Sequence, residues 1–138
     1  MLHIVKAALR WFTGRGRNAP PTALGTRGER LVARYVRRKL GMKVLARNVL
    51  CPDGELDLVA LDGGDLVFVE VRTRRAAHAG PPEMTIGPRK RAFLLRSARW
   101  FVRTRRLKDF NPRFDVAAVI WPQEGAPTVR YHRNYFSA

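Results

Sequence analysis

Two apolar strands joined by a Gly-Gly turn constrain the fold of this chain more than any other feature. The segment 54–72 reads GELDLVALDGGDLVFVEVR, with strand-forming residues on both sides of Gly63 and Gly64. A two-residue Gly-Gly loop suits the primed turns that β-hairpins favour. The spacing therefore predicts an antiparallel hairpin over about 55–73, with these two glycines as its loop.

The same hairpin register places acidic side chains of the two strands opposite each other. Counting outward from the loop, Asp57 faces Glu70 and Glu55 faces Arg72. Side chains alternate between the faces of a strand, so both pairs share one face. Directly opposed carboxylates destabilise a sheet, which indicates a cation between Asp57 and Glu70. Mg²⁺ and Mn²⁺ prefer carboxylates and backbone carbonyls, and the carbonyl of Val71 is the natural further ligand.

The charge of the chain indicates a polyanionic partner. Lys and Arg number 27 against 11 Asp and Glu, which gives a net charge of +16 over 138 residues. A nucleic acid or an anionic membrane surface matches such a surplus. A merely solvated basic surface is the alternative. The acids are not scattered, however, because four of them lie between positions 53 and 62.

The length and the cysteine count fit one cytoplasmic domain with an N-terminal arm. The single Cys51 excludes an intramolecular disulfide and argues against a cysteine-based zinc site. No run approaches the roughly 18 apolar residues of a membrane-spanning helix, so no integral membrane segment is expected. We expect residues 1–21 to form a basic, amphipathic arm and linker, and residues 22–138 to form the domain. A weakly ordered arm is the simplest interpretation, and contact with a membrane or a partner is the alternative.

The remaining patterns predict an α/β domain. The expected order is a helix from Thr26 to about Gly41, a strand over 42–50, the hairpin, a helix over 88–107, and strands over 113–121 and 128–136. A loop over 74–87 precedes the second helix, which we expect to link parallel strands. This order indicates a mixed five-stranded sheet flanked by helices.

Five sequence blocks resemble the bacterial YraN family. They occur in the family's order within about 22–136: GE at 28–29, GELDL at 54–58, VFVEVRTR at 67–74, PRKR at 88–91 and RFDV at 113–116. That family is similar to restriction-endonuclease-like PD-(D/E)xK nucleases and closest in character to Holliday junction resolvases. The resemblance implies a restriction-endonuclease-like three-layer domain with a divalent-metal nuclease site.

The resemblance also assigns roles to individual residues. Asp57 and Glu70 would be metal ligands, Glu29 the acid carried by the helix, and Arg72 stands where the motif usually has Lys. Arginine keeps its charge, so Arg72 suits phosphate stabilisation better than proton transfer. Lys90 on the second helix is an alternative source of an amine. The basic residues expected to contact nucleic acid are Arg74, Arg75, Arg89, Lys90 and Arg91.

Glu29 and Glu55 also have structural interpretations. Thr26 and Glu29 match a capping box at the start of the first helix. Glu55 would form an ion pair with Arg72 across the hairpin.

Asp57, Glu70 and Asp115 have structural interpretations as well. If Asp57 and Glu70 point outward, they pair with arginines such as Arg47 or Arg74. Asp115 is expected to bind an arginine or the backbone as a structural partner rather than to ligate a metal.

These observations favour a Mg²⁺- or Mn²⁺-dependent endonuclease that hydrolyses phosphodiester bonds in structured, branched DNA. The alternative is a nucleic-acid-binding module that keeps the nuclease-like fold with weak or no catalysis. A protein that docks through its N-terminal arm ranks behind both. The junction-resolvase resemblance also suggests a homodimer.

Overall fold

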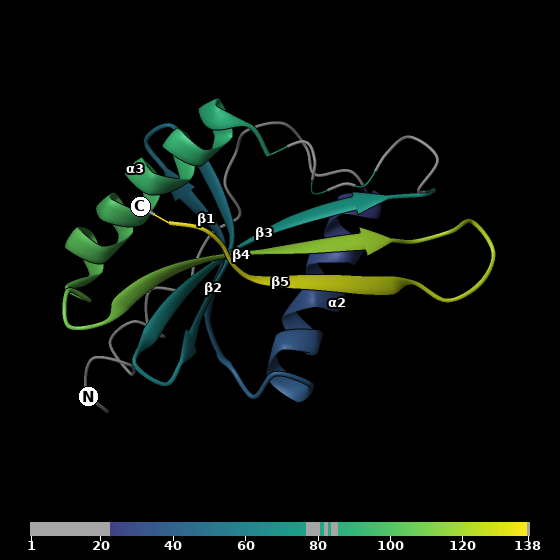
Figure 1. Cartoon of the computed structure of the whole chain (residues 1–138), viewed down its shortest axis with the longest axis horizontal. Helices are drawn as coiled ribbons and strands as arrows, with labels where there is room; N and C mark the ends of the chain where they lie inside the picture. Colours follow the sequence, from purple (N-terminus) through teal and green to yellow (C-terminus); the bar gives the residue numbers. More distant parts are fainter. Residues whose placement is uncertain (1–22, 77–80, 82, 84–85, 138) are drawn as a thin grey trace.

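A mixed five-stranded sheet lies between two helices (Figure 1). The computed structural model describes residues 23–76, 81, 83 and 86–137, so the expected arm over 1–21 lies outside the described residues. The elements are α2 (Ala23–Arg38), β1 (Lys43–Cys51), β2 (Gly54–Asp62), β3 (Asp65–Arg74), α3 (Pro88–Arg105), β4 (Asn111–Ile120) and β5 (Thr128–Phe136). Their order confirms the predicted α/β class, and the layers are consistent with a restriction-endonuclease-like domain.

The sheet follows the chain order, and the parallel pair is the one that α3 connects. The strands lie in the order β1-β2-β3-β4-β5, with β3 and β4 parallel and the other neighbours antiparallel. A helix between two strands is the usual way to return the chain for parallel pairing. The crossover therefore confirms the predicted link between the hairpin and the C-terminal strands.

The central hairpin forms in the predicted register. Asp62 pairs with Asp65, and the ladder continues to the pair Leu58–Val69. Gly63 has φ 58°, a left-handed conformation that glycine adopts without steric cost. Beyond Leu58 and Val69 the regular β2–β3 ladder ends, one residue before Asp57 and Glu70.

A strand irregularity around Asp57 explains why the ladder ends there. Leu56 is buried in the cluster under α3, whereas Leu58 is buried in the cluster under α2. Residues two apart in a regular strand share a face, so β2 changes face between these two leucines. On the neighbouring strand β1, Asn48 has φ 51°, a left-handed conformation. Counting residues outward from the loop therefore no longer gives the cross-strand partners beyond Asp57. For this reason the predicted pairing of Glu55 with Arg72 is wrong.

Two hydrophobic clusters hold the helices against the sheet. Val32 and Val36 of α2 pack with Val67 and Val69 on one face. On the other face, α3 contributes three buried side chains to a cluster that also contains Phe68: Leu94, Ala98 and Phe101. Phe68 and Phe101 meet edge to face with ring centroids 5.9 Å apart. None of the helices described here is both long and apolar enough to cross a membrane.

The first helix departs from the predicted start. It begins at Ala23, three residues before the predicted N-terminus, so Thr26 is an internal helical residue and the capping box is wrong. The carboxylate of Glu29 is engaged by Asn48 of β1 instead. At the other end the helix stops at Arg38, and Gly41 turns the chain with φ 68°, as predicted.

Asp115 is a structural residue, as expected. Its carboxylate is fully buried and accepts two hydrogen bonds from Arg113, each 3.0 Å long. The hydroxyl of Tyr131 donates to it at 2.6 Å and the backbone N–H of Asn134 at 2.8 Å. A carboxylate with four donors is satisfied without a metal, and this network fixes β5 to β4.

Gly28 sets the distance between α2 and the sheet. A Cβ atom at this position would overlap the hydroxyl of Thr73 on β3. We predict that Gly28→Ala pushes α2 away from β3 and lowers the free energy of unfolding by about 1–3 kcal/mol. Urea unfolding measures the loss, and adding Thr73→Ala should recover part of it. Equal losses with and without Thr73→Ala would contradict this account of the contact.

Candidate functional site

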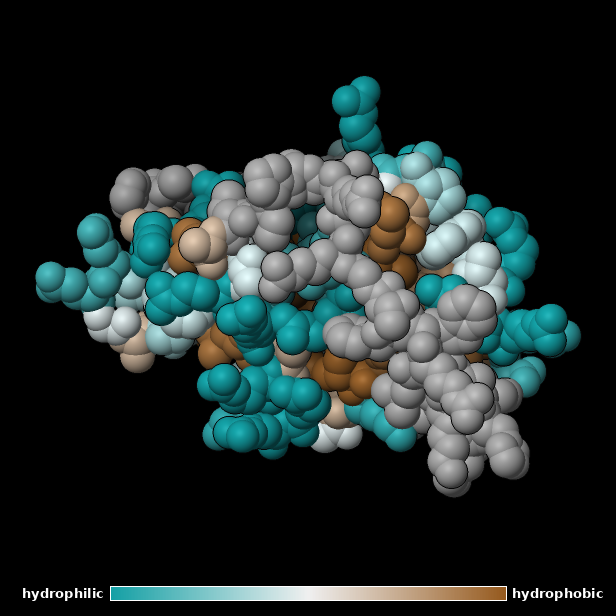
Figure 2. All heavy atoms as spheres, turned by 180° about the vertical axis from the view of Figure 1, so that it is seen from behind, coloured by the Kyte–Doolittle hydropathy of each residue, from teal (hydrophilic) through white to brown (hydrophobic). Residues whose placement is uncertain are grey.

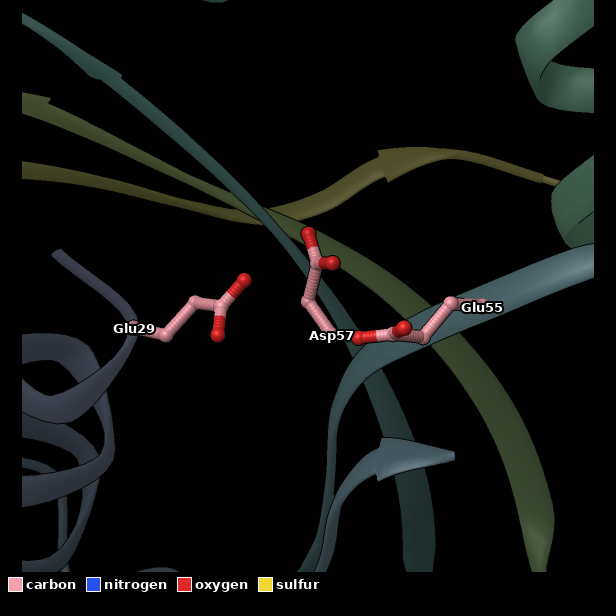
Figure 3. Close-up of side chains that lie close together, drawn as sticks. All are labelled: Glu29, Glu55 and Asp57. Carbon is pink, nitrogen blue, oxygen red and sulfur yellow. The ribbon is translucent and has the colours of Figure 1, made fainter. Parts of the chain in front are cut away.

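Three carboxylates from two elements converge at the end of the hairpin. Glu29 comes from the first half of α2, whereas Glu55 and Asp57 come from β2 (Figure 3). One carboxylate oxygen of each lies within 4.8 Å of those of the other two. We call these three residues the acidic cluster. Figure 3 shows Glu29 reaching from the helix toward the strand that carries the other two acids.

Asn48 of β1 holds two members of the acidic cluster in place. Its side-chain amide donates to Glu29 at 2.7 Å and to Glu55 at 2.8 Å. Asparagine tolerates the left-handed backbone conformation found at this position better than most residues. Sequence reasoning missed Asn48, although an asparagine within an otherwise strand-forming run was a usable signal.

Asp57 is bound to the backbone of the neighbouring strand. Its Oδ2 atom accepts a hydrogen bond of 2.9 Å from the N–H of Val71. Burial, together with the nearby charge of Glu70, raises the pKa of Asp57 well above its ordinary value, and the Val71 hydrogen bond opposes this shift only partly. Asp57 is therefore a carboxylate whose negative charge lacks full compensation.

Glu70 is the most buried acid of the site. Its side chain is only 4% exposed, and its Oε1 atom lies 3.2 Å from Nε of Arg72 and 3.3 Å from Nζ of Lys90. Its Oε2 atom is buried and has no hydrogen-bond partner within the part of the chain that the structure describes. A buried carboxylate oxygen without a hydrogen-bond partner is costly, so this oxygen is able to accept a hydrogen bond or bind a cation.

Electrostatic coupling joins Glu70 to the acidic cluster. Burial raises the pKa of Glu29, and the charges of Glu55 and Glu70 add to this effect, while Asn48 and Arg47 oppose it. Glu70 thus acts on both Glu29 and Asp57. The alternative in which both acids point outward is wrong for Glu70, which is buried against Arg72 and Lys90, and Asp57 accepts a hydrogen bond from the backbone of Val71.

The structure places Arg72 beside Glu70 rather than beside Glu55. The two residues are two apart on β3 and therefore share a face of the strand. Lys90 reaches the same carboxylate oxygen from the first turn of α3. Two cations thus contact Glu70, one from the hairpin and one from the helix. A metal-ligating role for the carbonyl of Val71 stays a prediction.

A basic groove adjoins the acidic cluster. It has a volume of about 670 Å³ and extends from Glu55 to the start of α3. Its charged lining consists of Arg89, Lys90 and Arg96 together with Glu55 and Asp53, and Asp53 pairs with Arg96 at 3.2 Å. Arg91 lies elsewhere, with its guanidinium 5.5 Å from the ring centre of Phe136. Arg74 ends β3 and Arg75 follows it as an exposed residue, so neither lines this groove.

The arrangement has the chemistry of a divalent-cation site. It offers several carboxylate oxygens, a hard donor set that suits Mg²⁺ or Mn²⁺. Burial raises the pKa of Glu29 and of Asp57, and the charges of the neighbouring carboxylates add to this effect. Glu70 provides an independent indication, because one of its buried oxygens lacks a partner among the described residues.

The pKa of Asp57 predicts how stability depends on pH in the presence of EDTA. The native state holds a proton on Asp57 to higher pH than the unfolded state, so this group lowers stability as pH rises from about 4 through the raised pKa. Asp57→Asn removes that loss. The variant should gain stability relative to the wild type as pH rises, which thermal unfolding at pH 4 to 8 measures. A difference in stability between the two proteins that does not change with pH would contradict the raised pKa of Asp57.

The backbone and the side chain of Asn48 make separable contributions to stability. Asn48→Gly loses both hydrogen bonds but keeps the left-handed conformation without strain. Asn48→Ala loses the bonds and adds a strained β-carbon, so we expect it to be about 1–2 kcal/mol less stable than the glycine variant. Urea unfolding tests the order wild type, glycine, alanine. An alanine variant as stable as the glycine variant would show that the fold does not require a left-handed φ at residue 48.

Comparison with known proteins identifies the family. Residues 28–119 match the family described as Uncharacterised protein family UPF0102. A UPF0102 protein of Syntrophotalea carbinolica is 48% identical over 97 residues, which cover 70% of this chain and 78% of the relative. Another, of Geobacter sulfurreducens, is 41% identical over 113 residues, covering 82% and 88% of the two chains. The chain therefore belongs to the UPF0102 family, and its resemblance to YraN proteins is confirmed.

Proposed function

We propose that this protein is a divalent-metal-dependent endonuclease that hydrolyses phosphodiester bonds in structured, branched DNA. The observation that carries the proposal is the buried Glu70: its Oε2 atom has no hydrogen-bond partner among the described residues, and its charge acts on both Asp57 and Glu29. Carboxylates are rarely buried together unless a cation compensates them. A metal that also binds phosphate oxygens gives such a site a function.

Asp57 and Glu70 are the proposed ligands of Mg²⁺ or Mn²⁺. They lie on adjacent strands of one hairpin at the end of its regular ladder, so the sheet fixes their separation. Glu29 and Glu55, both held by Asn48, are proposed to bind metal-coordinated water or the ion itself. The bound ion would supply an activated water molecule and neutralise charge on the phosphodiester.

Arg72 and Lys90 are the proposed phosphate-stabilising groups. Both contact the same oxygen of Glu70, and both side chains are 30% exposed, so a ligand can reach them. Arg72 stays charged and presents a planar array of donors to phosphate oxygens. If a metal takes over the charge of Glu70, both cations become available to the substrate. In this proposal, Arg72 and Lys90 together take the role of the lysine that the motif usually has at position 72.

The surface charge supports a nucleic-acid substrate. The basic groove leads directly to Glu55, and exposed arginines continue along both helices. On α2 these are Arg27, Arg30, Arg34, Arg37 and Arg38. Figure 2 shows hydrophilic side chains over most of the coloured surface on the reverse face of the molecule. Phosphate contacts of this kind make affinity fall steeply with salt. The preference for branched DNA rests on the family resemblance.

A binding module without turnover is the second candidate. The observation that favours it is the pair of contacts from Arg72 and Lys90 to Glu70, which compensate one acid without a metal. Both candidates predict salt-sensitive binding, and they differ in cleavage.

Cleavage assays on the full chain distinguish the two candidates. We expect Mn²⁺- or Mg²⁺-dependent cleavage of branched, flap or single-stranded DNA. Asp57→Asn and Glu70→Gln should lower it at least about 100-fold, since even residues that only support metal ligands change activity 10–100-fold. Asp109→Asn, which changes an exposed acid outside the site, is the matched control. DNA binding without cleavage above the Asp57→Asn background would favour the binding module.

A further inference from the structure

A second groove lies beyond the proposed nuclease site, between the C-terminal half of α3 and the start of β4. It has a volume of about 570 Å³, within the range of ligand-binding clefts. Five apolar side chains form its floor: Leu95, Ala98, Val102, Pro112 and Phe114. Four cations stand around them: Arg99, Arg103, Arg106 and Lys108. We call this surface the apolar groove.

The floor of the apolar groove follows a helical repeat. Leu95, Ala98 and Val102 are spaced i, i+3 and i+7 along α3, so they form one stripe. The stripe spans about 10 Å at the helical rise of 1.5 Å per residue. Helices that lie in grooves present apolar anchors at the same spacing. The floor therefore has the period and length that an amphipathic helix requires.

The cations of the apolar groove form a second stripe parallel to the first. Arg99 and Arg103 are spaced i and i+4 along α3, Arg106 follows as the left-handed C-cap of the helix, and Lys108 lies where the chain turns toward β4. All four are exposed, and no acidic side chain lines the groove within the described part of the chain. Favourable interaction with the C-terminus of α3 explains a cation in its last turn. It does not explain Arg99, which lies more than one turn earlier.

The charge and the side-chain exposure of the apolar groove argue against four possible occupants. A second copy of this chain carries a net charge of +16, and residues 1–21 contain four Lys and Arg and no acid, so both would be repelled. A membrane would require protruding apolar side chains, whereas Leu95 and Val102 are half-buried. A single-stranded nucleic acid would require exposed aromatic rings for stacking, whereas Phe114 is 3% exposed.

We propose that the apolar groove docks an acidic amphipathic helix of a partner protein. Its apolar face contacts Leu95 and Val102, and its acids pair with Arg99 and Arg103. Arg99 and Arg103 lie about 14 Å and 20 Å along α3 from Lys90 at the helical rise, so a helix that pairs with them leaves the nuclease site open. The interaction would recruit this protein to an assembly while its proposed active site engages DNA.

A charge-exchange experiment tests the proposal. The probe is a fluorescein-labelled synthetic helix with leucines at i, i+3 and i+7 flanked by glutamates, and its partner probe has lysines in place of the glutamates. We expect the full chain to bind the acidic probe in fluorescence anisotropy. The double variant Arg99→Glu with Arg103→Glu should bind it at least tenfold more weakly and should bind the lysine probe more tightly than the wild type does.

The matched control is the double variant Arg37→Glu with Arg38→Glu. It changes the net charge equally on the exposed end of α2, away from the groove, and should keep its affinity for the acidic probe. An equal loss in both double variants would overturn the proposal, because only overall charge would then matter. A probe with alanine in place of leucine that binds equally well would also overturn it. So would groove-dependent binding of anionic vesicles or single-stranded DNA without binding of the acidic helix.

Discussion

The burial of carboxylates beside one another is the constraint on which the candidate site of this protein depends. Folding brings Asp57 and Glu70 together at the end of the hairpin and carries Glu29 to them on α2. Burial raises the pKa of Asp57 and Glu29, so this arrangement works against stability in the metal-free protein. Two large apolar clusters, one on each face of the sheet, stabilise the domain against that local cost. A cation bound among the acids would remove the repulsion and stabilise the fold further.

The irregularity of two strands makes the site possible. A regular β2 would pair its backbone with β3 past Leu58, whereas here the N–H of Val71 binds the side chain of Asp57. The left-handed conformation of Asn48 directs its amide toward Glu29 and Glu55. Conformations that cost free energy persist where the surrounding structure holds them, and functional sites often contain them. The same departure from regularity separates Glu55 from Arg72 and leaves Arg72 with Glu70.

The sequence predicted the fold well because its patterns are local. The Gly63–Gly64 loop and the alternation around it specify the hairpin, and Pro88 marks the start of α3, as it does in the structure. The choice of Asp57 and Glu70 as partners also follows from counting. The same counting gave the wrong partner for Glu55, because strict alternation of side chains does not reveal that β2 changes face between Leu56 and Leu58. The sequence marked Asn48 as unusual within its strand and Lys90 as an alternative amine, but the carboxylates that they contact belong to distant segments, which local patterns do not identify.

A crystal of the full chain soaked in Mn²⁺ tests the central claim most directly. We expect one anomalous peak bound by Asp57 and Glu70. Oε2 of Glu70, which has no hydrogen-bond partner in the described part of the chain, should be a ligand, and Arg72 or Lys90 should be displaced from Oε1. The absence of a peak from a well-ordered site would contradict it, provided that Asn48 still bridges Glu29 and Glu55 and both cations still contact Glu70. That result would identify the acids as an internally compensated structural network.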